Sequence, residues 1–156
     1  VAAAFTLIAA GYCVYRKHVP EALVLVLSLA IAGLLTTPLK DFFAVPRPSD
    51  PIVQTRGYAY PSGHSAYAVL YVSIAVTLER VRDIISRAAL VIAAVGLTAA
   101  IALSRVYLRA HYLSDVIGGV AMTAAITAIL AAIAFLVIHI RRLRAEGSGD
   151  AADIVE

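Results

Sequence analysis

Cysteine and charged residues are scarce in this chain, and both shortages limit what the protein can be. Its 156 residues include a single cysteine, Cys13, so no disulfide can form within the chain, and we interpret this residue as a small buried hydrophobic group. Charged residues make up only 15% of the sequence, and the formal net charge is +3. No basic stripe with interleaved aromatic residues is present, which argues against nucleic acid as a partner.

Apolar residues are in excess. They account for 62% of the sequence, with a mean hydropathy of +0.88, whereas a soluble domain is about half apolar. The excess lies in runs near the length of a bilayer crossing, roughly 17 to 25 residues. These runs lack the alternation of polar and apolar residues that a barrel requires, and a spanning helix satisfies its own backbone. We therefore predict an all-α fold, a polytopic transmembrane helix bundle.

Charged and proline-containing segments divide the apolar sequence into five predicted spans: 1–15, 21–43, 63–79, 86–104 and 113–140. The first span is short for a full crossing, and we expect it to be truncated, since the chain begins at Val1 without methionine. A cleavable signal is not favoured, because a basic leading segment is missing. We expect residues 1–145 to form one integral membrane domain and the polar residues 146–156 to form a disordered tail.

The distribution of basic residues predicts the orientation in the membrane. If the spans alternate, eight basic residues lie on one side: Arg16, Lys17, Arg80, Arg82, Arg87, Arg141, Arg142 and Arg144. Five lie on the other side: Lys40, Arg47, Arg56, Arg105 and Arg109. The side with more basic residues is expected to be cytoplasmic. We therefore expect an integral protein of the plasma membrane.

Ionisable residues at the edges of the apolar runs form three short blocks, and such residues in a membrane chain indicate a functional site. The blocks are Lys40 with Arg47-Pro48, then Pro61-Ser62-Gly63-His64, then Ser104-Arg105 with His111 and Asp115. The predicted topology puts all three on the non-cytoplasmic side. Blocks far apart in the sequence can therefore converge on one site.

The second block is typical of a helix start. Ser62 is a good N-cap residue, and the unpaired N–H groups of a helix N-terminus attract an oxyanion. Gly63 has no side chain, so its backbone can approach a phosphate closely. His64 would lie in the first turn, at the edge of the site. The alternative for this residue is a capping or interfacial histidine.

The third block predicts an activated histidine. If a helix begins near Arg109, His111 and Asp115 lie four residues apart on one face. The carboxylate can accept the Nδ1–H of the imidazole, which leaves Nε2 unprotonated, as a nucleophile requires. The alternative is a helical His–Asp pair in a solvated loop. Arg105 argues against that, because its guanidinium can clamp phosphate oxygens from the end of a span.

The first block supplies two further cations. Pro46 and Pro48 interrupt the helix between Lys40 and Arg47, so we expect Lys40 at a helix end and Arg47 in a rigid extended turn. The alternative for Lys40 is snorkelling toward the interface, which is common near span ends.

The three blocks together predict phosphoryl transfer through the protein. Lys40, Arg47 and Arg105, with the backbone of Ser62 and Gly63, would bind the phosphate oxygens. His111 would attack phosphorus, Asp115 would orient it, and His64 would protonate the leaving group and then activate water. The blocks contain one carboxylate, so we expect no magnesium and no cofactor.

These blocks, in this order and spacing, resemble the signature of the type 2 phosphatidic acid phosphatase superfamily, also called lipid phosphate phosphatases. Vanadium haloperoxidases share this site. The matching positions are Lys40, Arg47, Pro48, Pro61, Ser62, Gly63, His64, Ser104, Arg105, His111 and Asp115. The resemblance implies a helical core, a histidine nucleophile, a histidine acid and metal-independent hydrolysis. Membrane members usually have six spans, which implies one span more than the five seen here.

Three functions stay open at this stage. The leading one is an integral membrane phosphatase of a lipid phosphate or diphosphate, such as phosphatidate, phosphatidylglycerol phosphate or a polyprenyl diphosphate. A vanadate-dependent haloperoxidase is second, and its large soluble relatives do not match the five apolar spans. A non-catalytic membrane protein that binds anionic headgroups is third, and the spacing of His111 and Asp115 argues against it. We interpret Gly118-Gly119 as small residues for close helix packing.

Overall fold

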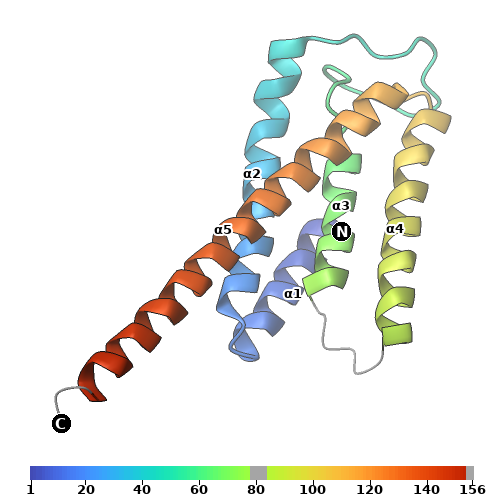
Figure 1. Ribbon diagram of the computed structural model, residues 1–156. Helices are drawn as coiled ribbons and strands as arrows, with labels where there is room; N and C mark the ends of the chain where they lie inside the picture. Colours follow the sequence, from blue (N-terminus) through green and yellow to red (C-terminus); the bar gives the residue numbers. More distant parts are fainter. Residues whose placement is uncertain (78–83, 154–156) are drawn as a thin grey trace.

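The computed structural model describes residues 1–77 and 84–153, with side chains described over 1–77 and 88–145. This part of the chain folds into helices, as predicted: α1 (Ala2–Tyr15), α2 (Val19–Phe43), α3 (Gly63–Thr77), α4 (Ile84–Tyr107) and α5 (Leu113–Asp153). Figure 1 shows α2, α3 and α4 running side by side, with α5 crossing them obliquely. The last two residues of the predicted third span, 78–79, lie outside the described residues.

The helix boundaries differ from the predicted spans mainly at the C-terminus. Helix α2 begins two residues early, with Pro20 in its first turn, where a missing N–H is tolerated. Helix α5 continues to Asp153 instead of ending at residue 140. The polar residues 146–153, for which we expected disorder, are therefore helical. No proline interrupts the sequence between Leu113 and Asp153, so nothing in it forces the helix to end.

Three of the five helices are long and apolar enough to cross a membrane. They are Val19–Phe43, Ala88–Tyr107 and Leu113–Ala145, with mean hydropathies of 2.3, 2.1 and 2.5. Helix α1 is apolar but has only 14 residues, and the part of α3 that the structure describes has 15. Length and composition therefore support three of the five predicted crossings.

Helix α3 is the centre of the bundle, because it packs against each of the other four helices. Small buried residues such as Ala66 and Ala68 let the neighbours come close to it, and Leu70 fills the space between them. A second cluster joins α1 to α2 and includes Cys13, which is buried and free, as expected. The interior is thus built largely from small side chains.

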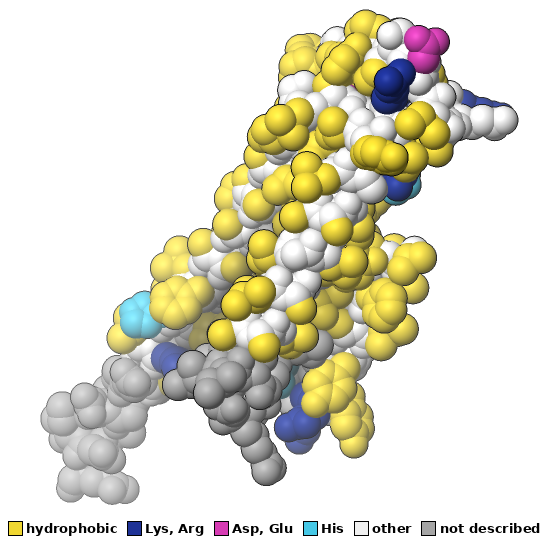
Figure 2. All heavy atoms as spheres, turned by 90° about the vertical axis from the view of Figure 1, so that its right-hand side faces the viewer, with side chains coloured by type: hydrophobic (Ala, Val, Ile, Leu, Met, Phe, Trp, Pro, Cys, Tyr) yellow, Lys and Arg dark blue, Asp and Glu magenta, His cyan; other side chains and the backbone are white. Residues whose placement is uncertain are grey.

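The outside of the bundle is apolar. Large hydrophobic side chains are exposed along the distal half of α5, including Ile129, Ile133, Phe135 and Leu136. The space-filling view in Figure 2 shows hydrophobic atoms over most of one face, with charged atoms near its two ends. The hydrocarbon of a bilayer solvates such an apolar surface well, whereas water does not.

The three sequence blocks meet at one end of the bundle. Helix α2 ends there, the 44–62 loop crosses it, and α3 begins there (Figure 1). The short turn between α4 and α5 lies at the same end. Lys40 is in the last turn of α2, Arg105 is in the last turn of α4 and Asp115 is in the first turn of α5. The topology therefore brings all three blocks together.

Candidate active site

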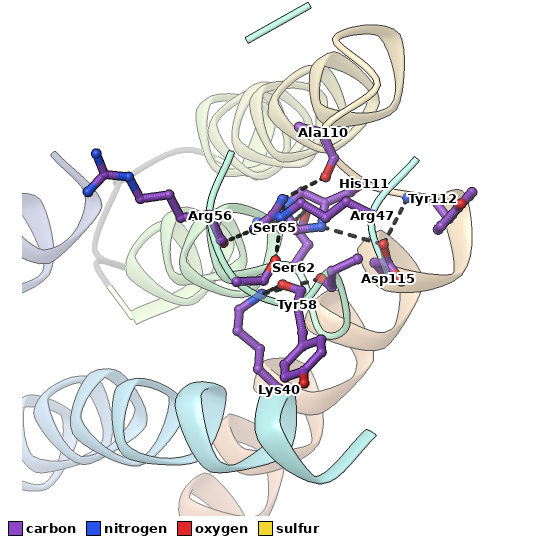
Figure 3. Close-up of polar contacts among 12 residues, drawn as sticks. Lys40, Arg47, Arg56, Tyr58, Ser62, Ser65, Ala110, His111, Tyr112 and Asp115 are labelled. Atoms are coloured by element: carbon purple, nitrogen blue, oxygen red, sulfur yellow. Dashed lines mark hydrogen bonds and ion pairs between the residues drawn. The ribbon is translucent and has the colours of Figure 1, made fainter. Parts of the chain in front are cut away.

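A polar cavity of about 410 Å³ opens where the blocks converge. Its lining residues come from α2, α3 and α4, from the 44–62 loop and from the turn before α5: Lys40, Arg47, Val53, Gln54, Thr55, Arg56, Gly63, His64, Tyr67, Arg105, Ala110 and His111. Three cations and two imidazoles of the predicted site thus face one space. Figure 3 shows Arg47 and His111 side by side, with Lys40 on one side and Asp115 behind the imidazole.

His111 and Asp115 are paired, although not on one helix face as predicted. Helix α5 begins at Leu113, so His111 lies in the turn before it. The Nδ1 of His111 is nevertheless 3.5 Å from Oδ2 of Asp115, and both side chains are buried, with exposed fractions of 5% and 1%. The helix starts later than expected because Asp115 caps it: its Oδ2 accepts the backbone N–H of Tyr112 at 2.8 Å.

Backbone hydrogen bonds hold His111 in this turn. The carbonyl of Arg105 accepts the N–H groups of Ala110 and His111, at 3.0 and 3.2 Å. Arg109, just before them, has a left-handed backbone with φ of 51°. The end of α4 therefore positions the imidazole directly, and Asp115 at the start of α5 lies behind it.

Arg47 joins the loop to this turn. Its Nε donates to the carbonyl of Gly57 at 2.9 Å, and its Nη2 donates to that of Arg56 at 2.9 Å. Its Nη1 donates to the carbonyl of Ala110 at 2.7 Å and lies 3.4 Å from Nε2 of His111. A guanidinium has only N–H donors, so Nε2 acts as the acceptor and the proton of a neutral imidazole lies on Nδ1, toward Asp115.

The environment keeps His111 neutral. Burial and, to a smaller extent, the cations Arg47 and Lys40 together lower the pKa of His111 to about 4, although Asp115 acts in the opposite direction. An unprotonated Nε2 facing the cavity is thus the dominant form at neutral pH.

Lys40 and Arg105 complete the cationic wall. The Nζ of Lys40 donates to the carbonyls of Tyr58 and Ala59, at 2.8 and 3.3 Å. Among the residues that the structure describes, Arg105 has one hydrogen-bond partner: its Nε donates to Oγ of Ser104 at 3.2 Å. Its two terminal amino groups therefore keep their donors for an anion.

Ser62 does not reach the cavity, contrary to the role expected for it. It is fully buried, and its backbone N–H donates to the carbonyl of Asp115 at 2.9 Å. Its Oγ accepts the hydroxyl of Ser65 at 3.0 Å and the N–H of Ser65 at 3.5 Å, the pattern of an N-cap. Ser62 therefore ties α3 to α5, and Gly63 and His64 present the helix N-terminus to the cavity.

The glycine pair of α5 makes this tie possible. A Cβ at Gly119 would overlap the carbonyl oxygen of Ser62, and a Cβ at Gly118 would overlap the ring of Tyr60. The interpretation of these glycines as close-packing residues is confirmed.

Part of the cavity wall comes from residues outside the three sequence blocks. Val53, Gln54 and Thr55 line it from the loop, and Tyr67 lines it from the second turn of α3. These residues belong to no block and follow no period, so no sequence signal singled out the loop residues. Arg56 also lines the cavity, whereas Arg109 does not. No group of three His, Cys, Asp or Glu side chains that could hold a metal ion occurs in the described part of the chain.

Comparison with known proteins agrees with this geometry. Residues 21–139 match the PAP2 superfamily, and this range contains all three blocks. Phosphatidylglycerophosphatase B of Bacillus subtilis is 34% identical over 117 residues, which cover 72% of this chain and 57% of the relative. The chain thus spans less than two thirds of that relative.

A solved structure gives the same result for the fold. The crystal structure of the first transmembrane PAP2 type phosphatidylglycerolphosphate phosphatase from Bacillus subtilis superposes with a TM-score of 0.72 at 29% identity. The match covers 83% of this chain and 66% of the other. The resemblance read from the three blocks is confirmed, and the chain belongs to the PAP2 superfamily.

Proposed function

We propose that this protein is an integral membrane phosphatase that hydrolyses a lipid phosphate or diphosphate through a phosphohistidine at His111. One observation carries the proposal. The cations Lys40, Arg47 and Arg105 line the same cavity as the Nε2 of a buried, neutral histidine, and a carboxylate lies behind that histidine. A cationic cradle next to an unprotonated nucleophile matches the needs of phosphoryl transfer.

The cations would bind the phosphate oxygens. Arg105 has free donors for this, and Lys40 and Arg47 already direct their donors at carbonyls around the cavity. The N-terminal turn of α3, at Gly63 and His64, adds backbone N–H groups and partial positive charge. Three fixed cations supply the charge that a magnesium ion supplies in other phosphotransferases, so we propose that no divalent ion is required.

In the first step Nε2 of His111 attacks phosphorus, and the bond between phosphorus and the ester oxygen breaks. The electron pair of that bond goes to the leaving oxygen, which takes a proton from His64. Asp115 stabilises the positive charge that develops on the imidazole, because its Oδ2 lies 3.5 Å from Nδ1.

In the second step water attacks the phosphohistidine. His64 accepts a proton from the water, the bond between Nε2 and phosphorus breaks, and inorganic phosphate leaves. His64 is exposed and lines the cavity, so solvent can reach it. The protein then returns to its starting protonation state.

The membrane supports a lipid as the substrate. The cavity lies at the ends of α2 and α4 and beside the turn that leads into α5, and within the described residues these three helices are long and apolar enough to cross a bilayer. We propose that α1 and α3 also cross, as five predicted spans require, and that the cavity faces away from the cytoplasm. Phosphatidylglycerol phosphate is the first substrate to test, given the name of the Bacillus subtilis relative. Phosphatidate and polyprenyl diphosphates present the same phosphate group.

The test is a phosphate-release assay on purified protein without divalent ions, with these lipids in parallel. We expect release from at least one lipid, and an acid-labile, alkali-stable phosphoenzyme in single-turnover experiments. His111→Ala removes the nucleophile and should lower the rate by several orders of magnitude, as loss of a nucleophile does in other covalent hydrolases. His139→Ala is the matched control, because His139 is exposed on the distal part of α5.

Two results would contradict the proposal. Bromide oxidation with vanadate and peroxide, in place of phosphate release, would favour a haloperoxidase. Anion binding without turnover of any lipid would favour a protein that binds headgroups.

A further inference from the structure

One wall of the polar cavity consists of loop residues that the proposed mechanism does not use. Gln54, Thr55 and Arg56 are consecutive in the 44–62 loop, and we call them the loop wall. Each of these side chains has at least one hydrogen-bond donor. None of the three side chains bonds to another residue that the structure describes. The loop wall therefore keeps its side-chain donors for a bound molecule.

Hydrogen bonds to the main chain hold the loop wall in place on both sides. Before it, the N–H of Ile52 donates to the carbonyl of Leu108 at 3.1 Å. At its other end, the guanidinium of Arg47 donates to the carbonyls of Arg56 and Gly57, both at 2.9 Å. The free side chains thus extend from an anchored backbone, which lowers the entropy that a ligand has to remove on binding.

The charge of Arg56 is not neutralised within the cavity. Its side chain is exposed, and a guanidinium stays protonated at all relevant pH values. No Asp or Glu occurs among the described residues that line the cavity. In Figure 3 the guanidinium of Arg56 points away from Arg47 and His111. A positive charge is therefore directed at a part of the cavity that is separate from the nucleophile.

The cavity has more room than one phosphate group fills. Its volume is about 410 Å³, whereas a water molecule takes up about 30 Å³ in the liquid, and a phosphate group is the size of a few waters. Part of the leaving group therefore lies in the cavity together with the reacting phosphate.

We propose that Arg56 binds a second phosphate group of the substrate, one that the leaving group carries and that a short spacer separates from the reacting phosphate. The inference rests on the proposed phosphatase function and narrows its substrate class. A phosphate monoester joined through glycerol to a phosphodiester, as in phosphatidylglycerol phosphate, has this arrangement. Phosphatidate does not, because its leaving group is an uncharged diacylglycerol.

The chemistry of the loop wall suits this group. A guanidinium binds two oxygens of one phosphate at once, through charge-assisted hydrogen bonds. The neighbouring amide of Gln54 and hydroxyl of Thr55 can bond to the hydroxyl of a glycerol spacer. The reacting phosphate already has Lys40 and Arg105 in the cavity wall, so it does not need Arg56.

Enzyme kinetics on the full chain test the role of Arg56. Phosphatidylglycerol phosphate and phosphatidate with identical acyl chains are compared in the same detergent micelles. Arg56→Gln removes the charge and leaves the backbone carbonyl that Arg47 binds. We expect the ratio of kcat/KM between the two lipids to fall about tenfold, as for loss of one exposed charge-assisted hydrogen bond. The fall should appear in KM for phosphatidylglycerol phosphate, because the second phosphate takes no part in bond breaking.

Two further variants define the effect. Arg56→Lys keeps the charge and should retain most of the preference. Arg109→Gln is the matched control, because Arg109 is exposed at the same end of the bundle but does not line the cavity. It should leave the ratio unchanged. The preference of the unmodified protein should also shrink as salt is added, since salt screens an exposed cation.

Binding measurements separate this inference from the proposed phosphatase function. In the His111→Ala background, native mass spectrometry gives the affinities for the two lipids without turnover, and Arg56→Gln should lower their ratio by a similar factor. An unchanged ratio, or an equal loss for both lipids, overturns the inference. If the unmodified protein hydrolyses no lipid, the proposed function fails, and the binding ratio still decides the role of Arg56.

A second pair of substrates tests the spacer. Farnesyl diphosphate and farnesyl phosphate differ by a phosphate that is bonded directly to the reacting one. We expect Arg56→Gln to change the preference within this pair less than the preference within the first pair. A larger change in the farnesyl pair would place Arg56 beside the reacting phosphate and overturn the inference.

Discussion

At the scale of single residues, Arg47 and Asp115 act on opposite sides of one imidazole. Arg47 lies 3.4 Å from Nε2 of His111, and Asp115 lies 3.5 Å from Nδ1. An incoming phosphate has to take donors that Arg47 now directs at three carbonyls and at Nε2. In the proposed mechanism the anion replaces the guanidinium next to Nε2 of His111, so we expect anion binding to free the nitrogen that attacks phosphorus.

Asp115→Asn tests the orienting carboxylate. The amide keeps an oxygen for the N–H of Tyr112 but loses the charge that stabilises a positive imidazole. We expect the rate of phosphoenzyme formation to fall by about a hundredfold or more, as loss of the equivalent charge does in a serine protease triad. Rapid-quench measurement of the phosphoenzyme gives this rate. Asp41→Asn, at an exposed position on α2, is the control, and an equal loss in both variants would refute the role.

The pH dependence follows from the lowered pKa of His111. Since this pKa is about 4, the free protein should keep an unprotonated Nε2 throughout the range above it. The acid limb of kcat/KM that belongs to His111 is therefore expected near pH 4. Lys40→Met removes a cation that disfavours the imidazolium, so the pKa should rise and the limb should move to higher pH. A limb that stays in place, measured with a soluble phosphate ester, would contradict this account.

The same pKa predicts acid sensitivity. An unfolded histidine binds its proton near pH 6.5, and the folded one binds it near pH 4. Below pH 6.5 the unfolded state therefore holds more protons, and the free energy of unfolding falls as the pH falls toward 4. Thermal unfolding across this range should show the loss, and His111→Gln should reduce it.

At the scale of helices, the critical contact is the one between the first turn of α3 and the first turns of α5. The carbonyl of Asp115 accepts the N–H of Ser62, and Gly119 lies against the carbonyl of Ser62. These two backbones approach closely because Gly119 has no side chain. His111 and the N-terminal end of α3 are thus held in register by backbone contacts.

Gly119→Ala breaks that register. Its new Cβ would overlap the carbonyl oxygen of Ser62, which is backbone and cannot rotate away. We expect a loss of about 1 to 3 kcal/mol in stability, typical of overpacking, together with a fall in kcat. Gly96→Ala on α4 is the control, because a Cβ there meets nothing within 4 Å. Unfolding midpoints and kcat for the two variants decide the matter, and equal behaviour would refute the contact.

At the scale of the whole molecule, the site occupies one end of a bundle whose sides are apolar. The turn between α1 and α2 lies at the opposite end in Figure 1, and it carries Arg16 and Lys17. The excess of basic residues away from the site favours that end as cytoplasmic.

Cysteine labelling tests the orientation. In a Cys13→Ser background, Ser49→Cys places a thiol in the 44–62 loop, and Arg16→Cys places one at the opposite end; both positions are exposed. A maleimide that cannot cross membranes should label Ser49→Cys in intact cells and label Arg16→Cys only after permeabilisation. The reverse pattern would place the cavity in the cytoplasm.

Local patterns in the sequence were enough to predict the helices and the convergence of the blocks. Apolar runs of bilayer length leave the backbone no alternative to helices, and the prolines around Arg47 end α2 where the loop begins. No helix lies between the first and second blocks, and two helices, α3 and α4, lie between the second and third. Because successive helices alternate in direction, all three blocks, with Lys40, His64, Arg105 and Asp115, come to the same end of the bundle.

The tertiary structure decided which atoms face the cavity. Arg47 finds its carbonyl partners 9, 10 and 63 residues away, in loops without any period, and no local rule predicts that. Ser62 is buried because its backbone N–H donates to the carbonyl of Asp115. His111 lies before α5 because the side chain of Asp115 caps that helix. Residue types and spacing thus predicted which side chains would meet at one end of the bundle. The direction of each hydrogen-bond donor depended on long-range backbone contacts that form only in the folded chain.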